Sequence, residues 1–60
     1  MTQEMIKDLY LKSVKKTDEM EASEDYDGRD YDYEQGYQDA LETLFHNLYG
    51  IFLWDFVEQN

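Results

Sequence analysis

The chain of 60 residues contains no cysteine and no proline. Without cysteine it can form neither disulfides nor thiolate metal sites. Its longest apolar block, residues 49–54, is far too short to span a bilayer. The N-terminus lacks the apolar core of a signal peptide. We therefore expect a cytoplasmic protein with no membrane partner, and the absence of cysteine fits a reducing compartment.

Basic residues are also scarce. Lysine and arginine number 5 against 15 aspartates and glutamates, so the formal net charge is −10. This charge disfavours nucleic acid and anionic membranes as direct partners, and it suits a basic protein surface or a divalent cation. With 42% hydrophobic and 17% aromatic residues, the chain is too apolar to be a disordered acidic segment.

The short length limits the hydrophobic core. A chain of this size forms one domain at most, and we treat 1–60 as a single small helical domain. It buries only about 60% of its unfolded surface, so a monomer would be marginally stable. Self-association, a partner or an oxygen-ligated metal could supply the missing stability. We therefore expect a homodimer.

The first helix is predicted from Thr2 to Met20. Thr2 is a plausible N-cap, and no strong stop signal appears before the end of this range. Apolar side chains recur at helical spacing along it, namely Met5, Ile6, Leu9, Tyr10 and Val14.

The second helix is predicted from Asp32 to Tyr49. Asp32 would cap it, with Gln35 completing a variant of the capping box, and Gly50 would end it. Small residues at Gly36 and Ala40 would let another helix approach closely. One apolar stripe is formed by Tyr37, Leu41, Leu44 and Leu48, and it is widened by Ala40, Phe45 and Tyr49.

The C-terminal tail, residues 51–60, is predicted as a short helix or helical turn. A strand would find no second strand to pair with. In a helix, Phe52 and Phe56 would share a face and Trp54 would point elsewhere. The fold expected is therefore all-α, an antiparallel hairpin closed by the tail. The residues assigned to its core or to a subunit interface are Tyr37, Leu41, Leu44, Leu48, Phe52, Trp54 and Phe56.

The acidic middle is the most unusual segment. Residues 18–34 hold nine carboxylates against Arg29, for a net −8, and residues 21–31 are expected to connect the helices. If helical, they would present one carboxylate per about 3 Å, close to the 3.4 Å phosphate spacing of a DNA strand. A solvated loop is the simpler interpretation. The contact surface predicted for a basic partner comprises Asp25, Tyr26, Asp27, Asp30, Tyr31, Asp32, Tyr33 and Glu34.

Calcium is the alternative for this segment. With Gly28 as the turn glycine of an EF-hand loop, four of the five signature positions match, at Asp25, Asp27, Gly28 and Glu34. The mismatch is Ser23, which replaces the first carboxylate. Asp30 also occupies a position where EF-hands place an aliphatic residue.

Catalysis has little support in the sequence. His46 is the only histidine, and Glu42 with His46 supplies two potential metal ligands, which do not make a site. An inter-helix loop offers no dry cleft in which carboxylates could act as acid and base. We expect no enzymatic activity and treat His46 as an ordinary surface residue.

A short chain without cysteine or proline, with an Asp/Glu/Tyr-rich centre and the helix EQGYQDALETL, resembles the small acidic accessory proteins of bacteriophages. The resemblance is one of overall character and identifies no functional residue. It implies an inhibitor of a host nucleic-acid-handling or defence protein that acts by occupancy. The alternatives are a calcium-binding helix–loop–helix protein and a structural protein that self-assembles.

Overall fold

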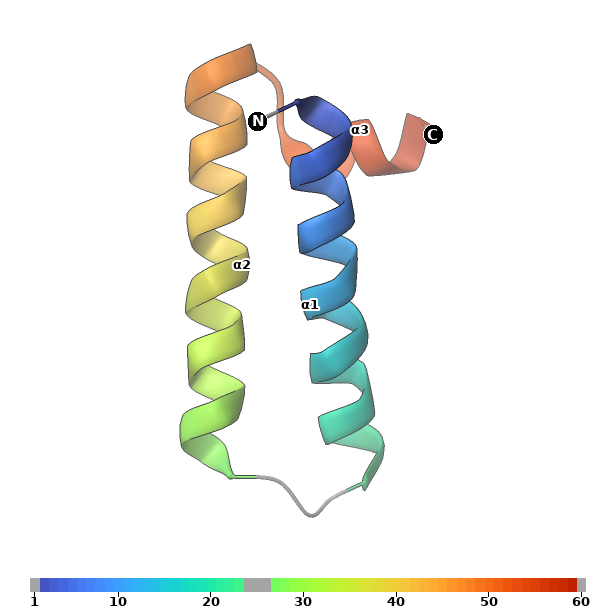
Figure 1. Cartoon of the computed structure of the whole chain (residues 1–60), viewed down its shortest axis with the longest axis vertical. Helices are drawn as coiled ribbons and strands as arrows, with labels where there is room; N and C mark the ends of the chain where they lie inside the picture. Colours follow the sequence, from blue (N-terminus) through green and yellow to red (C-terminus); the bar gives the residue numbers. More distant parts are fainter. Residues whose placement is uncertain (1, 24–26, 60) are drawn as a thin grey trace.

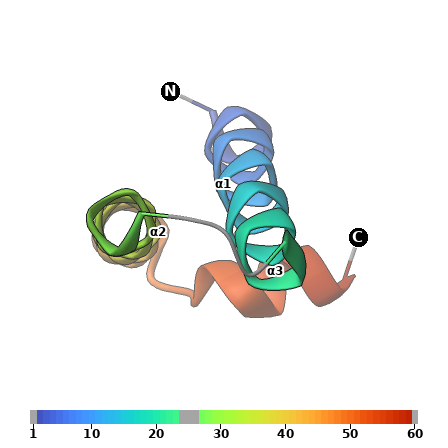
Figure 2. The same cartoon turned by 90° about the horizontal axis from the view of Figure 1, so that it is seen from below.

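The chain folds into an antiparallel pair of long helices followed by a short third one (Figure 1). The computed structural model describes residues 2–23 and 27–59. Helix α1 covers Gln3–Ser23, α2 covers Gly28–Tyr49 and α3 covers Leu53–Gln59. Seen along the hairpin, α3 lies across one face of it (Figure 2). The all-α hairpin predicted from the sequence is confirmed.

The start of α1 follows the predicted cap. The Thr2 Oγ1 atom accepts a hydrogen bond of 3.2 Å from the backbone N–H of Met5. The helix then continues to Ser23, beyond the predicted end at Met20. No proline or glycine interrupts this stretch, and the Ser23 hydroxyl donates a 3.1 Å hydrogen bond to the Met20 carbonyl.

Helix α2 begins earlier than predicted. Its N-cap is Asp27 rather than Asp32, with extended backbone angles and a carboxylate that accepts a 2.8 Å bond from Arg29 N–H. The earlier cap adds a turn of backbone hydrogen bonds and places Asp30 in the first turn, where a negative charge favours the helix dipole. The predicted connection at 21–31 was therefore too long, because residues 21–23 and 28–31 are helical.

The end of α2 is as predicted. Gly50 adopts a left-handed conformation, with φ 74°, and its N–H donates a 2.8 Å bond to the His46 carbonyl. Such angles favour glycine because it has no Cβ. The chain then enters α3, whose first turn is anchored by the Phe52 carbonyl accepting from Asp55 and Phe56. The tail is thus a helix.

The core lies at the end of the hairpin that α3 covers. Phe45 is its centre, with ring centroids 4.9 Å from Tyr49 and 5.3 Å from Phe56. Each fully buried side chain of this kind is worth about 1.5–3 kcal/mol. The buried apolar residues are Ile6, Leu41, Phe45 and Leu53, and partly buried Leu9, Tyr10, Tyr49, Phe56 and Val57 pack against them.

The buried side of α2 differs from the predicted stripe. It runs through Gln38, Leu41 and Phe45, whereas other members of the stripe face solvent. Gln38 is buried opposite α1, where Ser13 and Thr17 accept hydrogen bonds from its amide. Gly36 is exposed with open space around it, so the close helix approach expected there is not made within the hairpin. The stripe members that remain exposed are Tyr37, Leu44 and Leu48.

The two tail phenylalanines do not share a face. Phe56 packs on the core, but Phe52 is 44% exposed and stacks on Trp54. The helical spacing assumed for these residues does not apply, because α3 starts at Leu53 and Phe52 lies just before it.

Candidate functional site

Exposed carboxylates gather at the turn end of the hairpin. The last turns of α1 and the first turns of α2 meet there, while the four lysines of α1 lie earlier in that helix, at residues 7–16 (Figure 1). We call this cluster the acidic tip, and its described members are Asp18, Glu19, Glu21, Asp27, Asp30 and Asp32, all exposed. The charge is therefore concentrated at one end, not spaced along one rod like the phosphates of a strand.

Side-chain contacts order the acidic tip. The Tyr31 hydroxyl donates a 2.5 Å hydrogen bond to the Glu21 carboxylate and so links α2 to α1. Asp27 is held as the N-cap of α2. Tyr33, in the second turn of α2, is 74% exposed. Of the contact surface predicted from the sequence, Asp25 and Tyr26 lie outside the described residues.

Glu34 is the member of the predicted contact surface whose side chain is mostly buried. Its side chain is only 12% exposed and turns towards α1. There it accepts a 2.6 Å hydrogen bond from the Ser13 hydroxyl and lies 3.7 Å from the Lys16 ammonium. This carboxylate is used within the fold, because Ser13 and Lys16 of α1 provide the donors that its burial requires.

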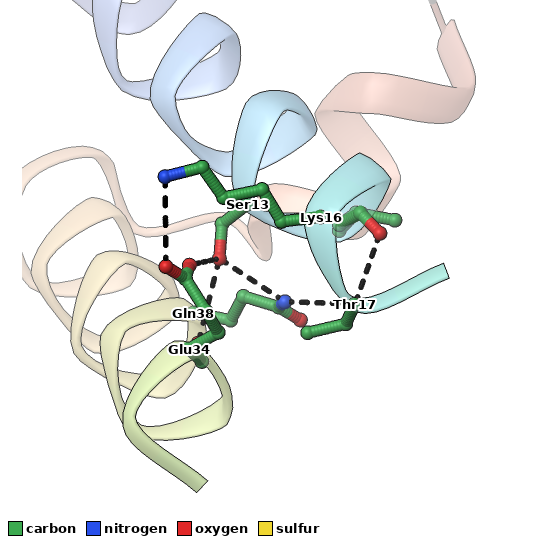
Figure 3. Close-up of polar contacts among 6 residues, drawn as sticks. Ser13, Lys16, Thr17, Glu34 and Gln38 are labelled. Atoms are coloured by element: carbon green, nitrogen blue, oxygen red, sulfur yellow. Dashed lines mark hydrogen bonds and ion pairs between the residues drawn. The ribbon is translucent and has the colours of Figure 1, made fainter. Parts of the chain in front are cut away.

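A polar network fills the half of the hairpin next to the acidic tip (Figure 3). The buried Gln38 amide donates to Ser13 Oγ at 3.2 Å and to Thr17 Oγ1 at 3.3 Å, and Thr17 donates in turn to the Val14 carbonyl at 2.9 Å. The described buried side-chain polar atoms all have partners. The sequence analysis missed this network. The available signal was that Ser13 and Thr17 follow Ile6 at spacings of seven and eleven, on its side of the helix.

The calcium loop is not formed by the described residues. Gly28 starts α2 instead of making a loop turn, and Ser23 is the last residue of α1. Glu34, which would be the bidentate ligand of the ion, instead accepts a hydrogen bond from Ser13. Asp25, the other ligand of this hypothesis, lies outside the described residues. Within the described part of the chain, no three ligating side chains come together as a metal site would require.

At the opposite end of the hairpin three rings stack on the surface. The His46 and Phe52 rings are 4.7 Å apart and nearly parallel, at 11°, and Phe52 and Trp54 are 4.5 Å apart, at 9°. They border an open groove of about 220 Å³ lined by Glu42, Thr43, His46, Asn47, Phe52 and Trp54. His46 is exposed, as predicted, and its ring also stacks on Phe52, which the sequence could not reveal because the stack depends on the turn after α2.

Beside this groove, Tyr10 and Glu42 join α1 to α2. The Tyr10 hydroxyl donates a 3.0 Å hydrogen bond to Glu42 Oε1. Burial is the largest of the effects that raise the pKa of Tyr10 above its usual value of 10.0. The hydrogen bond to Glu42, the negative charge of Glu42 and, least, the charge of Asp39 raise this pKa further. This bond stabilises the apolar half of the hairpin.

Comparison with protein-family models, with curated proteins and with solved structures finds no match to this chain. Among the described helices, none combines the length and the apolar character needed to cross a membrane. Function therefore has to be argued from the surfaces themselves.

Proposed function

We propose that this chain is a non-enzymatic binding protein that docks its acidic tip on a basic protein surface. By occupying that surface it inhibits a nucleic-acid-handling protein. The observation that carries this proposal is the grouping of six exposed carboxylates at one end of a helical hairpin.

The form of the acidic tip suits recognition of lysine and arginine. A compact patch of one sign steers an oppositely charged partner and raises the association rate. Its carboxylates project from two helices that Tyr31 and Glu21 tie together, so little ordering is needed on binding. Its six carboxylates outnumber the one basic residue among them, Arg29, so the acidic tip keeps a strongly negative charge.

A nucleic-acid-binding target is the partner best matched to this charge. Surfaces that bind phosphates present clustered lysines and arginines, and an acidic patch competes for those side chains. The resemblance to small acidic bacteriophage proteins supports the same class of target. If this is correct, nucleic acid and this protein exclude each other from the target.

The proposal is tested by affinity capture from a bacterial lysate with three immobilised proteins: the native chain, a tip variant and a charge-matched control. The tip variant carries Asp27→Asn, Asp30→Asn and Asp32→Asn, and asparagine at 27 still caps a helix. The control removes the same charge elsewhere, with Asp8→Asn, Asp55→Asn and Glu58→Gln, all at exposed positions.

We expect the native chain and the control to retain nucleic-acid-binding proteins that duplex DNA or high salt elutes. The tip variant should retain none of them. Equal capture by the tip variant and the native chain, or capture that duplex DNA does not disturb, would show that the acidic tip is not the binding surface.

We also propose that the protein works as a homodimer. The hairpin leaves many large hydrophobic side chains exposed, which on a soluble chain usually indicates an interaction surface. Of the tail, which was one expected interface, Leu53 and Phe56 are used in the core, while Phe52 and Trp54 remain exposed. A longer row of exposed apolar side chains lies on α2.

A further inference from the structure

A line of exposed apolar side chains runs along α2 beside the buried side. We call it the α2 stripe. Its large members are exposed although they recur at the three- and four-residue spacing of a helix contact. They are Tyr33 at 74%, Tyr37 at 37%, Leu44 at 39% and Leu48 at 55%, with exposed Ala40 among them.

The α2 stripe has a symmetric spacing. The centre of symmetry is the midpoint between Ala40 and Leu41. Tyr37 and Leu44 lie at equal distances on either side of it, and so do Tyr33 and Leu48. A two-fold axis at that midpoint would place Tyr37 against the other copy's Leu44 and Tyr33 against its Leu48. Self-complementary contacts of this kind are required of a two-fold dimer.

We infer that the α2 stripe is the contact between two copies of this chain, with their α2 helices antiparallel and Ala40 beside the two-fold axis. The inference rests on the proposed homodimer and names its interface. The small side chain of Ala40 lets the two helix axes approach closely where they cross. Tyr33, which the sequence assigned to the basic partner, then belongs to the interface.

Charge selects the antiparallel direction. The first half of α2 carries Asp30, Asp32 and Glu34 against Arg29, Asp39 and Glu42 follow near its middle, and residues 43–49 carry no carboxylate. Parallel helices would bring two acidic halves together. Antiparallel helices place each acidic half beside the partner's aromatic and aliphatic half, and they send the two acidic tips to opposite ends. Like charges are thereby kept apart.

Helix α3 does not compete for this face. Leu44 and His46 lie about 100° to either side of the buried Phe45, so they point to opposite flanks of α2. Phe52 stacks on His46 and leads directly into α3, which places α3 on the His46 flank (Figure 2). The α2 stripe occupies the other flank and is accessible to a second copy.

Cysteine pairing tests the arrangement directly, because the native chain has no cysteine. In the antiparallel dimer Tyr37 faces the partner's Leu44, while two copies of residue 37 lie about 10 Å apart along the helix. That separation exceeds the roughly 7 Å limit for a disulfide. A mixture of Tyr37→Cys and Leu44→Cys proteins under mild oxidation should therefore yield more mixed disulfide than both homodisulfides together.

Thr43→Cys is the control, because Thr43 is exposed on α2 but lies about 100° away from Leu44. It should form no disulfide with Tyr37→Cys. Homodisulfides of Tyr37→Cys in excess over the mixed product would indicate parallel helices and overturn the inference. The readout concerns self-association alone, so its failure leaves the capture experiment on the acidic tip unaffected.

Sedimentation gives a second test. The native chain should sediment with twice its 7.3 kDa mass, and Leu44→Asp should sediment as a monomer with its helical circular dichroism retained. The matched Thr43→Asp variant should remain a dimer. A monomeric native chain at high concentration, or a dimeric Leu44→Asp variant, would contradict the inference, and the disulfide experiment decides the matter if Leu44→Asp loses its helices.

Discussion

Ser13 of α1 donates a 2.6 Å hydrogen bond to the carboxylate of Glu34 on α2, across the half of the hairpin nearest the acidic tip. The same hydroxyl accepts from the Gln38 amide at 3.2 Å, so one small side chain serves two buried polar groups. Moving α1 along its axis would break both of these bonds, and buried polar groups that lose a partner are costly. This pair therefore contributes to the register of the hairpin.

Removing the hydroxyl should be destabilising. Ser13→Ala leaves the Glu34 carboxylate and the Gln38 amide each with one partner fewer, and we expect a loss of about 1–3 kcal/mol in the free energy of unfolding. Urea unfolding followed by circular dichroism, at one fixed protein concentration, measures this. Ser23→Ala is the matched control at an exposed position and should change stability by less than about 0.5 kcal/mol. Equal effects of the two would show that the network contributes nothing.

Phe45 and Phe52 provide a comparison of the same side chain in two settings. Phe45 is fully buried at the centre of the core, whereas Phe52 is 44% exposed in the ring stack. We expect Phe45→Ala to cost about 3–5 kcal/mol and to unfold much of the population. Phe52→Ala should keep the native helical circular dichroism at room temperature. If Phe52→Ala unfolded the chain and Phe45→Ala did not, the core would not be centred on Phe45.

Tyr10 should make stability depend on alkaline pH. Its pKa is raised in the folded chain, so the folded state holds the phenolic proton more tightly than the unfolded state. The resulting stabilisation is complete below the unfolded pKa of about 10 and is lost as pH rises through the higher folded pKa. The ionised phenolate would then face the Glu42 carboxylate, its present acceptor.

The measurement is the melting temperature of the native chain and of Tyr10→Phe between pH 8 and pH 11. The native advantage at pH 8 should shrink as pH rises, because phenylalanine has no proton to lose. A difference that stays constant across this range would contradict the prediction.

Two glycines should respond to alanine with opposite signs. Gly50 has φ 74°, so Gly50→Ala should cost about 1 kcal/mol or slightly more from backbone strain alone, since open space surrounds the new methyl group. Gly36 lies inside α2, also with open space, and Gly36→Ala should stabilise the helix by about 0.5–1 kcal/mol. Thermal unfolding of both variants tests the pair, and stabilisation by Gly50→Ala would rule out the left-handed end of α2.

The helix ends show what local sequence can predict. Thr2 and Gly50 were identified because capping depends only on neighbouring residues and each end offered one candidate. The start of α2 was predicted at Asp32 from the local pattern with Gln35, whereas the cap is Asp27. Asp27 gives the longer helix, and a local capping pattern carries no information on that length.

The buried side of α2 could not be predicted from α2 alone. Tyr37 and Leu44 are more apolar than Gln38, yet Gln38 is buried and they are exposed. The difference comes from Ser13 and Thr17, residues on another helix that supply its hydrogen-bond partners. Glu34 turns inwards for the same reason, because Ser13 and Lys16 of α1 supply the donors for its carboxylate.

The two halves of the hairpin are held by different forces, and this sets how it opens. Beside α3 the helices share the apolar core around Phe45 and Ile6, while towards the acidic tip hydrogen bonds of Ser13 and Gln38 replace it. Water can substitute for those bonds but not for the core. Backbone amides of α1 should consequently exchange their hydrogens fastest near Ser23 and slowest near Ile6. We therefore expect the hairpin to open first at the acidic tip, where the hydrogen bond between Tyr31 and Glu21 is a contact that must break.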